Sequence, residues 1–176
     1  MLMRCAAEAD VPAIAGIYRP EVADGTATFE LDPPDDAEML RRFRATTGAG
    51  FPYLVAEVDG RVAAYAYAGP FRPRPAFRFT VEDSIYVARA AQGRGIGLAL
   101  LKRLIDETAT LGYRQMVAVI GDSANQAASL ALHRAAGFAV VGQLPSVGHK
   151  HGRWLDTVYM QRALGCGDGM PPRTGL

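Results

Sequence analysis

Residues 80–100 read TVEDSIYVARAAQGRGIGLAL and indicate a strand, a glycine-rich turn and a helix in succession. Its first half is rich in β-branched and aromatic residues and predicts a strand that ends near Val87. A glycine-rich turn follows, and a helix begins near Gly95. Because Gly112 is a favourable C-terminal cap, we expect this helix to end at Leu111. Four of its residues repeat at helical spacing: Leu98, Leu101, Ile105 and Thr108.

The glycine-rich turn has the chemistry of an anion site, and it consists of Gln92, Gly93, Arg94, Gly95, Ile96 and Gly97. Glycines let the backbone approach a ligand closely, and the first N–H groups of the following helix point outward with the positive end of its dipole. Two nucleotide-binding patterns fail. No lysine follows Gly97, as a P-loop requires, and the GxGxxG spacing is not met. A glycine-rich connection without a ligand remains the alternative.

The rest of the chain predicts a mixed succession of strands and helices. Asp10 is the expected cap of a first helix, with Pro12 in its first turn. Asp122 or Ser123 is the expected cap of a later helix that continues to Ala136. The predicted strands cover seven ranges: 2–6, 52–58, 61–68, 79–87, 115–120, 138–144 and 154–161. The almost wholly apolar range 115–120 is typical of a central strand buried on both faces.

This order of elements predicts the α+β class. Antiparallel strands come early and a β-α-β crossover comes later, so we expect one mostly antiparallel sheet with helices on both faces. We expect a single domain over residues 1–164. A glycine- and proline-rich tail over 165–176 is predicted to be flexible.

Composition lowers the expectation of nucleic-acid or membrane partners. The chain has 176 residues, with 19 Lys and Arg against 18 Asp and Glu, and a net charge of +1 shows no basic excess. Cys5 and Cys166 have no metal-ligand spacing, and a disulfide framework is not expected. The N-terminus lacks the apolar region of a signal peptide. We therefore expect a cytoplasmic protein without a metal.

Several segments together resemble the GNAT superfamily of N-acetyltransferases. Gln92-x-x-Gly95-x-Gly97 is similar to its Arg/Gln-x-x-Gly-x-Gly/Ala motif, and a block from Asn125 to Phe138 is similar to its Asn-x-x-Ala-x-x-Leu-Tyr-x-x-x-Gly-Phe pattern. More narrowly, the phosphinothricin and methionine sulfoximine N-acetyltransferases resemble residues 80–87, 117–120, 132–133 and 148–154. The resemblance covers about residues 3–164 and implies the GNAT fold.

The resemblance implies that the acetyl group of acetyl-CoA moves to the α-amino group of a small amino-acid-like substrate. Substrates of the phosphinothricin, methionine sulfoximine or methionine sulfone type are implied. Glu82 is the candidate general base, because partial burial raises the pKa of a carboxyl group toward the useful range. A solvated position or an ion pair with Arg78 is the alternative. Asp83 is expected on the other sheet face.

His133 is the second candidate catalytic residue. Many relatives have Tyr at this position, and that Tyr is a proposed acid for the departing thiolate. His133 is therefore expected either to donate this proton or to hydrogen-bond CoA; a satisfied structural histidine is the alternative. Asn125, Ser129 and His133 are spaced by four, which predicts that they share one helix face.

The resemblance also implies the residues that contact CoA, with Gln126 as the alternative to Asn125. They are Ile85, Tyr86, Val87, Gln92, Gly93, Arg94, Gly95, Ile96, Gly97, Leu98, Asn125 and Ser129.

A proline-stiffened loop is the candidate for substrate recognition. Its arginines supply planar, bidentate donors for a carboxylate or phosphinate, and an exposed basic loop is the alternative. Phe71 and Phe77 are expected to wall the pocket. The expected substrate contacts are Arg72, Pro73, Arg74, Glu82, Asp83 and Ser84, while Lys150, His151 and Trp154 are expected to close the far side.

Homodimerisation is implied by the resemblance, and two other functions stay open. One is a GNAT enzyme that acetylates a protein N-terminus or a polyamine, although Arg72 and Arg74 disfavour a polycation. The other is a non-catalytic regulator that binds acyl-CoA. Glu82 disfavours this second alternative, because a sensor needs no base.

Overall fold

The structure is a computed structural model that describes residues 1–172. A single seven-stranded sheet crosses it in the order β1-β2-β3-β4-β5-β7-β6. All neighbouring strands are antiparallel except β4 and β5, which are parallel. The strands are β1 (Leu2–Cys5), β2 (Tyr53–Val58), β3 (Arg61–Pro70), β4 (Thr80–Val87), β5 (Gln115–Gly121), β6 (Ala139–Lys150) and β7 (Arg153–Ala163).

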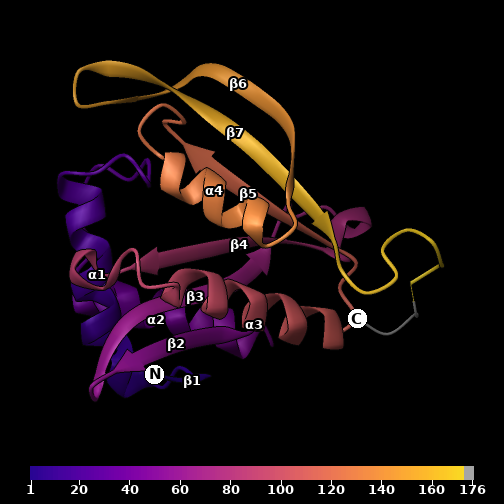
Figure 1. The fold of residues 1–176 in the computed structure, drawn as a ribbon, viewed down its shortest axis with the longest axis horizontal. Helices are drawn as coiled ribbons and strands as arrows, with labels where there is room; N and C mark the ends of the chain where they lie inside the picture. Colours follow the sequence, from indigo (N-terminus) through magenta and orange to yellow (C-terminus); the bar gives the residue numbers. More distant parts are fainter. Residues whose placement is uncertain (173–176) are drawn as a thin grey trace.

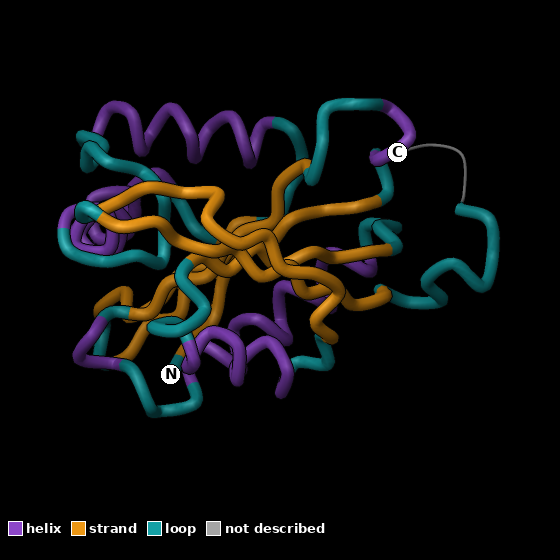
Figure 2. Tube along the Cα trace, turned by 90° about the horizontal axis from the view of Figure 1, so that it is seen from above, coloured by secondary structure: helices purple, strands orange, loops and turns teal. Residues whose placement is uncertain are grey.

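Helices cover both faces of this sheet, as expected (Figures 1 and 2). Within residues 1–172 the four α-helices are α1 (Val11–Ala23), α2 (Asp36–Gly48), α3 (Ile96–Thr110) and α4 (Ala127–Ala135). Short 3-10 helices cover Glu8–Asp10, Pro75–Phe77 and Arg89–Ala91. The predicted α+β class, the mostly antiparallel sheet and the β-α-β crossover through α3 are confirmed.

Two apolar cores lie on opposite faces of the sheet. The α3 core contains Leu100, Leu104 and Met116, and the core beneath α1 and α2 contains Ile14 and Tyr65. Removing such side chains from water is the main driving force for the fold. The β5 strand supplies buried residues along most of its length, so its predicted burial is confirmed.

The parallel pair β4 and β5 separates part-way along its length. Pairing runs from Thr80 with Gln115 to Asp83 with Ala118, whereas β4 continues to Val87. Figure 1 shows the two strands sharing one end and diverging toward the other. This separation leaves one edge of β4 without a strand partner beyond Asp83.

The β4 side chains alternate between the two cores. Val81 belongs to the α3 core, and Tyr86 packs against the core beneath α1 and α2. By strand parity Glu82 shares the face of Tyr86, and Asp83 shares the face of Val81. The regular register of β4 with β3 supports the prediction that Glu82 and Asp83 lie on opposite faces.

Of the two predicted helix caps, Asp10 occupies the N-cap position of α1 without a capping hydrogen bond from its side chain, and the cap of α4 is wrong. The Asp10 side chain does not cap α1; it accepts a hydrogen bond from the Ala7 N–H at 2.8 Å and pairs with Arg4. Neither Asp122 nor Ser123 caps α4, because the chain makes a turn after β5 and the helix begins only at Ala127. Both caps were placed on residues whose side chains find other partners.

The last hairpin also extends beyond its prediction. The strand expected over 138–144 is β6, and it continues to Lys150 after an irregular register between Leu144 and Gly148. A tight turn at His151 and Gly152 then leads into β7. Edge position and a register irregularity let β6 accommodate Pro145 within its span.

The domain boundary at 164 stays a prediction. Residues 165–172 follow β7 without a further helix or strand, and residues 173–176 of the expected tail lie outside the described part. Within residues 1–172, no helix has both the length and the apolar character that crossing a membrane requires.

Candidate active site

A cavity of about 1080 Å³ opens where β4 and β5 separate. The two diverging strands, the glycine-rich turn and α4 line it, and α1 and the loop that follows α1 complete the wall. The cavity is therefore reached from both faces of the sheet at the end of β4.

The glycine-rich turn has the conformation that an anion cradle needs. Gly93 and Gly95 have φ angles of 73° and 76°, a backbone conformation that residues with a side chain rarely adopt. A Cβ at either glycine would meet nothing within 4 Å, so the backbone faces open space. Gly95 is the N-cap of α3, and the first N–H groups of a helix have no acceptor within it. These donors fit a pyrophosphate.

Gly97 serves a different purpose in the same turn. A Cβ there would lie 2.7 Å from Leu132 Cδ1 and 3.2 Å from Val87 Cγ2. The missing side chain therefore lets α3 pack closely against α4 and the end of β4. Gln92 fixes the turn from the other side, because its Nε2 donates to the Val87 carbonyl at 3.2 Å.

The unpaired edge of β4 borders the cavity beside this cradle. Ser84, Ile85, Tyr86 and Val87 all line the cavity. Since backbone N–H and C=O groups along an unpaired strand edge remain free to bond, an extended polar chain fits against them. Ile96, Gly97 and Leu98 also line the cavity, whereas the exposed Arg94 does not appear in its lining.

Glu82 reaches the cavity from the α1 face of the sheet, and its side chain is half-buried. Burial raises the pKa of its carboxyl group, the neighbouring charge of Asp83 raises it further, and the charge of Arg72 lowers it. Among the described residues, no ion pair joins Glu82 to Arg78. The Arg78 guanidinium instead lies 4.5 Å from the Phe79 ring centroid.

Asp83 and His133 form a buried pair on the opposite face. His133 Nε2 lies 3.1 Å from Asp83 Oδ2, and the two side chains are 3% and 1% exposed. His133 Nδ1 lies 2.8 Å from the Ser129 carbonyl oxygen. Burial alone lowers the pKa of His133, but Asp83 and Ser129 outweigh it, so this pKa is raised. The sequence spacing gave no sign of this pair, because its members are 50 residues apart.

Asn125 does not share a helix face with Ser129 and His133, because it lies before α4. Its side-chain Nδ2 donates to Asp122 Oδ2 at 3.0 Å. Asn125, Gln126 and Ser129 nevertheless all line the cavity. The prediction of one shared helix face is therefore wrong for Asn125. Asn125, Ser129 and His133 nevertheless all line the same cavity.

The loop after α1 supplies wall residues that the sequence reasoning missed. Thr28 and Phe29 line the cavity together with Tyr18 of α1. The Phe29 ring packs on Gly121 and Gly148, where a Cβ would collide with it. The sequence shows an aromatic residue, Phe29, in a loop and glycines at 121 and 148, which lie in two separate strands of the structure. Nothing in the sequence indicates that these three positions come together.

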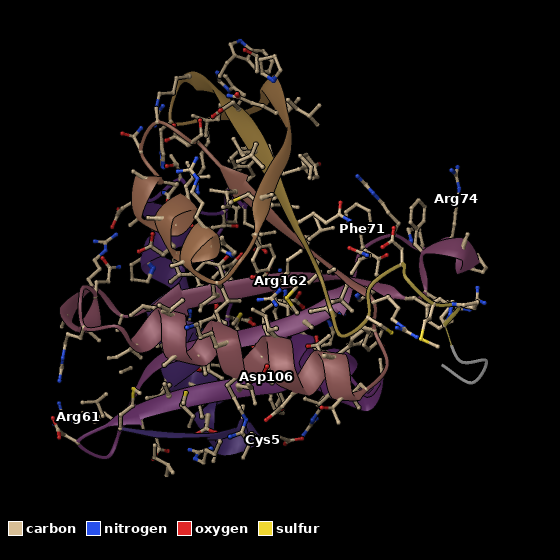
Figure 3. All side chains as sticks on the ribbon, turned by 45° about the vertical axis from the view of Figure 1, so that its right-hand side comes forward. Cys5, Arg61, Phe71, Arg74, Asp106 and Arg162 are labelled. Carbon is tan, nitrogen blue, oxygen red and sulfur yellow. The ribbon has the colours of Figure 1, made fainter. Side chains whose placement is uncertain are left out.

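The arginine loop lies beside the cavity rather than in its lining. Arg72, Pro73 and Arg74 are exposed, and Figure 3 shows Arg74 at the outer margin of the molecule. Phe71 and Phe77 contact each other with ring centroids 5.8 Å apart and are likewise outside the lining. The Arg72 charge nevertheless acts on the site, because it lowers the pKa of Glu82.

The three residues expected to close the far side have separate positions. Lys150 is buried, and its Nζ donates to the Thr28 carbonyl at 2.9 Å, which ties β6 to the loop after α1. His151 lies 3.2 Å from the Gly25 carbonyl oxygen. Trp154 is 66% exposed on β7. None of the three lines the cavity.

No metal-binding cluster is evident within the described residues. No three side chains of His, Cys, Asp or Glu come together there in a way that could hold an ion.

Comparison with known proteins agrees with this geometry. Residues 17–138 match the model of the acetyltransferase (GNAT) family. The chain is 51% identical over 177 aligned residues to a phosphinothricin N-acetyltransferase of Alcaligenes faecalis, covering 97% of this chain and 89% of the relative. It is 44% identical over 163 residues to an L-methionine sulfoximine/L-methionine sulfone acetyltransferase of Pseudomonas paraeruginosa, covering 92% and 94% of the two chains.

A solved structure shares the whole architecture. The crystal structure of a GNAT superfamily phosphinothricin acetyltransferase from Sinorhizobium meliloti, in complex with AcCoA, has a TM-score of 0.96 and 50% sequence identity. The alignment covers 99% of this chain and 94% of that one. The fold and the cradle thus define an acyl-group transferase. The chain belongs to the acetyltransferase (GNAT) family, and the resemblance seen in its sequence is confirmed.

Proposed function

We propose that the chain moves the acetyl group of acetyl-CoA to the α-amino group of a small amino-acid-like substrate. Substrates of the phosphinothricin, methionine sulfoximine or methionine sulfone type fit best, because close relatives bear these names. The observation that carries the proposal is the half-buried Glu82 carboxyl in the wall of the cavity that also contains the anion cradle.

The glycine-rich turn and the free edge of β4 are the proposed binding site of acetyl-CoA. Backbone N–H groups at the start of α3 would bind the pyrophosphate. Backbone groups of Ile85 and Val87 on the free edge of β4 would hydrogen-bond the pantetheine arm. From the other side, Ser129 and either Asn125 or Gln126 would contact this arm. The S. meliloti relative was crystallised with AcCoA, which supports this assignment.

Glu82 is the proposed general base, acting directly or through a water. An amine at neutral pH is largely protonated and lacks a free lone pair. Transfer of that proton to Glu82 lets the nitrogen attack the thioester carbonyl, so that the C–N bond forms. A raised pKa suits this step, because a base works best near the operating pH.

Departure of the CoA thiolate completes the reaction: the C–S bond breaks, and the nitrogen of the tetrahedral intermediate releases its second proton to water to give the neutral amide. His133 is the proposed proton donor to the thiolate, because it lines the same cavity on the α4 face. The two candidate proton carriers thus act from opposite faces of the sheet, one on the amine and one on the sulfur. No covalent bond to the enzyme is required.

Arg72 and Arg74 are the proposed recognition site for the acidic group of the substrate, with Asp83 and Ser84 in the adjoining wall. Arginine forks bind carboxylate and phosphinate groups bidentately. The influence of the Arg72 charge on Glu82 supports its closeness to the reacting end. Because the loop is exposed, the arginines would have to turn inward when substrate binds.

A substrate panel tests the proposal. Release of free thiol from acetyl-CoA is measured with methionine sulfoximine, methionine sulfone and phosphinothricin, and separately with spermidine and a peptide bearing a free N-terminus. We expect turnover with the first group and little with the second. The reverse order would favour an enzyme for another amine. Tight CoA binding without turnover of any amine would favour a regulator.

We also propose that two copies of the chain form a homodimer through β6 and β7. The β6 strand lies at the sheet edge, and this hairpin carries several large apolar side chains that are exposed: Val140, Val141, Leu144, Val147 and Trp154. Exposed apolar patches mark interaction sites in soluble proteins. Light scattering of the wild-type chain should give twice the monomer mass. The double variant with Val141→Lys and Trp154→Ala should give the monomer mass. A monomeric parent chain would contradict the proposal.

A further inference from the structure

The hydrogen-bond partners of His133 restrict its protonation state. Nδ1 lies 2.8 Å from the Ser129 carbonyl oxygen, which only accepts hydrogen bonds, so Nδ1 must carry a hydrogen. Nε2 lies 3.1 Å from Asp83 Oδ2. A proton must lie between these two atoms, because a bare nitrogen and a carboxylate oxygen would repel each other.

Asp83 depends on this contact in the same way. Its side chain is 1% exposed, and Oδ1 has no hydrogen-bond partner among the described residues. His133 Nε2 is the one donor recorded for Oδ2 in the same part of the chain. A buried carboxylate without a donor is strongly destabilised, so the charge on Asp83 favours a protonated ring opposite it.

We propose that Asp83 is a positioning residue that holds His133 as a doubly protonated imidazolium, the form that can give a proton to the CoA thiolate. The inference deepens the proposed function and rests on it for the identity of the proton acceptor. Asp83 thereby changes from an expected substrate contact into the partner of the acid. As the C–S bond breaks, the ring turns Nε2 away from Asp83 Oδ2 toward the sulfur and gives up the Nε2 proton, so that no bare nitrogen is left facing the carboxylate; the neutral ring retains its hydrogen at Nδ1.

Few other charges face the pair. The β5 strand, Gln115–Gly121, contains no ionisable side chain, and Arg134 of α4 is exposed. Arg162 of β7 donates to the Ala136 carbonyl at the end of α4. Glu82 lies on the other face, and its pKa responds to the Asp83 charge. Asp83 is therefore the principal charged partner of His133.

Nitrogen NMR of the wild-type chain tests the protonation state without reference to catalysis. The chain has three histidines, so loss of one signal set in His133→Gln identifies this ring. We expect both ring nitrogens of His133 to be protonated at neutral pH, and Asp83→Asn to make the ring neutral at a lower pH. A singly protonated wild-type ring at neutral pH, or an unchanged titration in Asp83→Asn, would overturn the inference.

The pH profile of kcat provides the catalytic readout. Activity that needs a protonated acid is lost as pH rises through the pKa of that acid. Asp83→Asn should therefore move the alkaline limb to lower pH, and it should move the acidic limb down as well by lowering the pKa of Glu82. Asp106→Asn, an exposed change on α3, should move neither limb.

A double-mutant cycle separates positioning from a merely structural role. If Asp83 acts through His133, the variant with both Asp83→Asn and His133→Gln should be no slower than His133→Gln alone. Losses that multiply would contradict the inference. Inactivity of the wild-type chain toward every amine would refute the proposed function instead, while the NMR result on the pair would stand or fall by itself.

Discussion

Asp83 of β4 and Ala118 of β5 are the last paired residues of the two parallel strands, and the cavity begins where their pairing ends. Because β4 continues to Val87 without this neighbour, its free edge, its side chains on both faces and the following turn all border one space. One strand thus brings a candidate base, a buried acid–histidine pair and an anion cradle together.

Removal of the Glu82 carboxylate should slow the reaction most. Glu82→Gln keeps the size of the side chain but cannot accept the proton, so kcat should fall by about 10²–10⁴-fold. The wild-type rate should fall as pH drops through the raised pKa of Glu82, and this acidic limb should be absent in the variant. Stopped thiol-release assays across pH measure both effects.

Glu107→Gln is the matched control, because Glu107 pairs with Arg103 on α3, away from the cavity lining. It should leave the rate and the pH profile unchanged. An acidic limb that persists in Glu82→Gln would assign the base to another group.

The cradle should be sensitive to a side chain at Gly95. Gly95→Ala forces a Cβ into a conformation with φ of 76°, which costs about 1–2 kcal/mol. The Michaelis constant for acetyl-CoA should rise about tenfold, which corresponds to about 1.4 kcal/mol, with a smaller effect on the amine. Gly16→Ala is the control: Gly16 is exposed inside α1 with nothing within 4 Å of a Cβ. It should stabilise the fold by about 0.5–1 kcal/mol and leave both constants unchanged.

Arg72→Ala tests the recognition of the acidic group. Hydrogen bonds to charged groups contribute about 1.5–3 kcal/mol, so the Michaelis constant for the amino-acid substrate should rise about 10–100-fold. The constant for acetyl-CoA should change little. Loss of the Arg72 charge should also raise the pKa of Glu82 and move the acidic limb to higher pH. Arg61→Ala, an exposed change in the β2–β3 hairpin, should do neither, and equal effects on both substrates would rule out the clamp.

Asp122 should contribute to stability in a pH-dependent way. It accepts hydrogen bonds from Arg153, Thr26 and Asn125, which lower its pKa to about 2. Since the folded-state pKa is depressed, this contribution is present above the unfolded value and is lost as pH falls toward about 2.

Asp122→Asn should therefore lower the free energy of unfolding by about 1–3 kcal/mol at neutral pH. The difference from wild type should shrink in acid. Urea unfolding at several pH values measures it, with the exposed Asp106→Asn as control. A difference that is independent of pH would contradict the role of the Asp122 charge.

The sequence predicted those features that depend on local pattern. Alternation and turn chemistry located the strands, and the parity of β4 placed Glu82 and Asp83 on opposite faces. The positive φ angles of Gly93 and Gly95 agree with the expected cradle.

Contacts between distant segments could not be predicted in this way. The Asp83–His133 pair joins two elements that meet only in the fold, and Phe29 finds its place between glycines of two separate strands. Asp10 and Asp122 make no side-chain caps for the same reason, because both carboxylates bond to arginines elsewhere in the chain. Local sequence preference fails to predict the structure where a side chain hydrogen-bonds to a residue from a distant segment.

The most direct measurement follows the acetyl group itself. The chain is incubated with acetyl-CoA labelled in the acetyl group and with methionine sulfoximine, and the products are analysed by NMR and mass spectrometry. We predict that the label moves to the α-nitrogen of the amine, with one free CoA thiol released for each acetylated molecule. Binding of acetyl-CoA without transfer to this or any related amine would contradict the account.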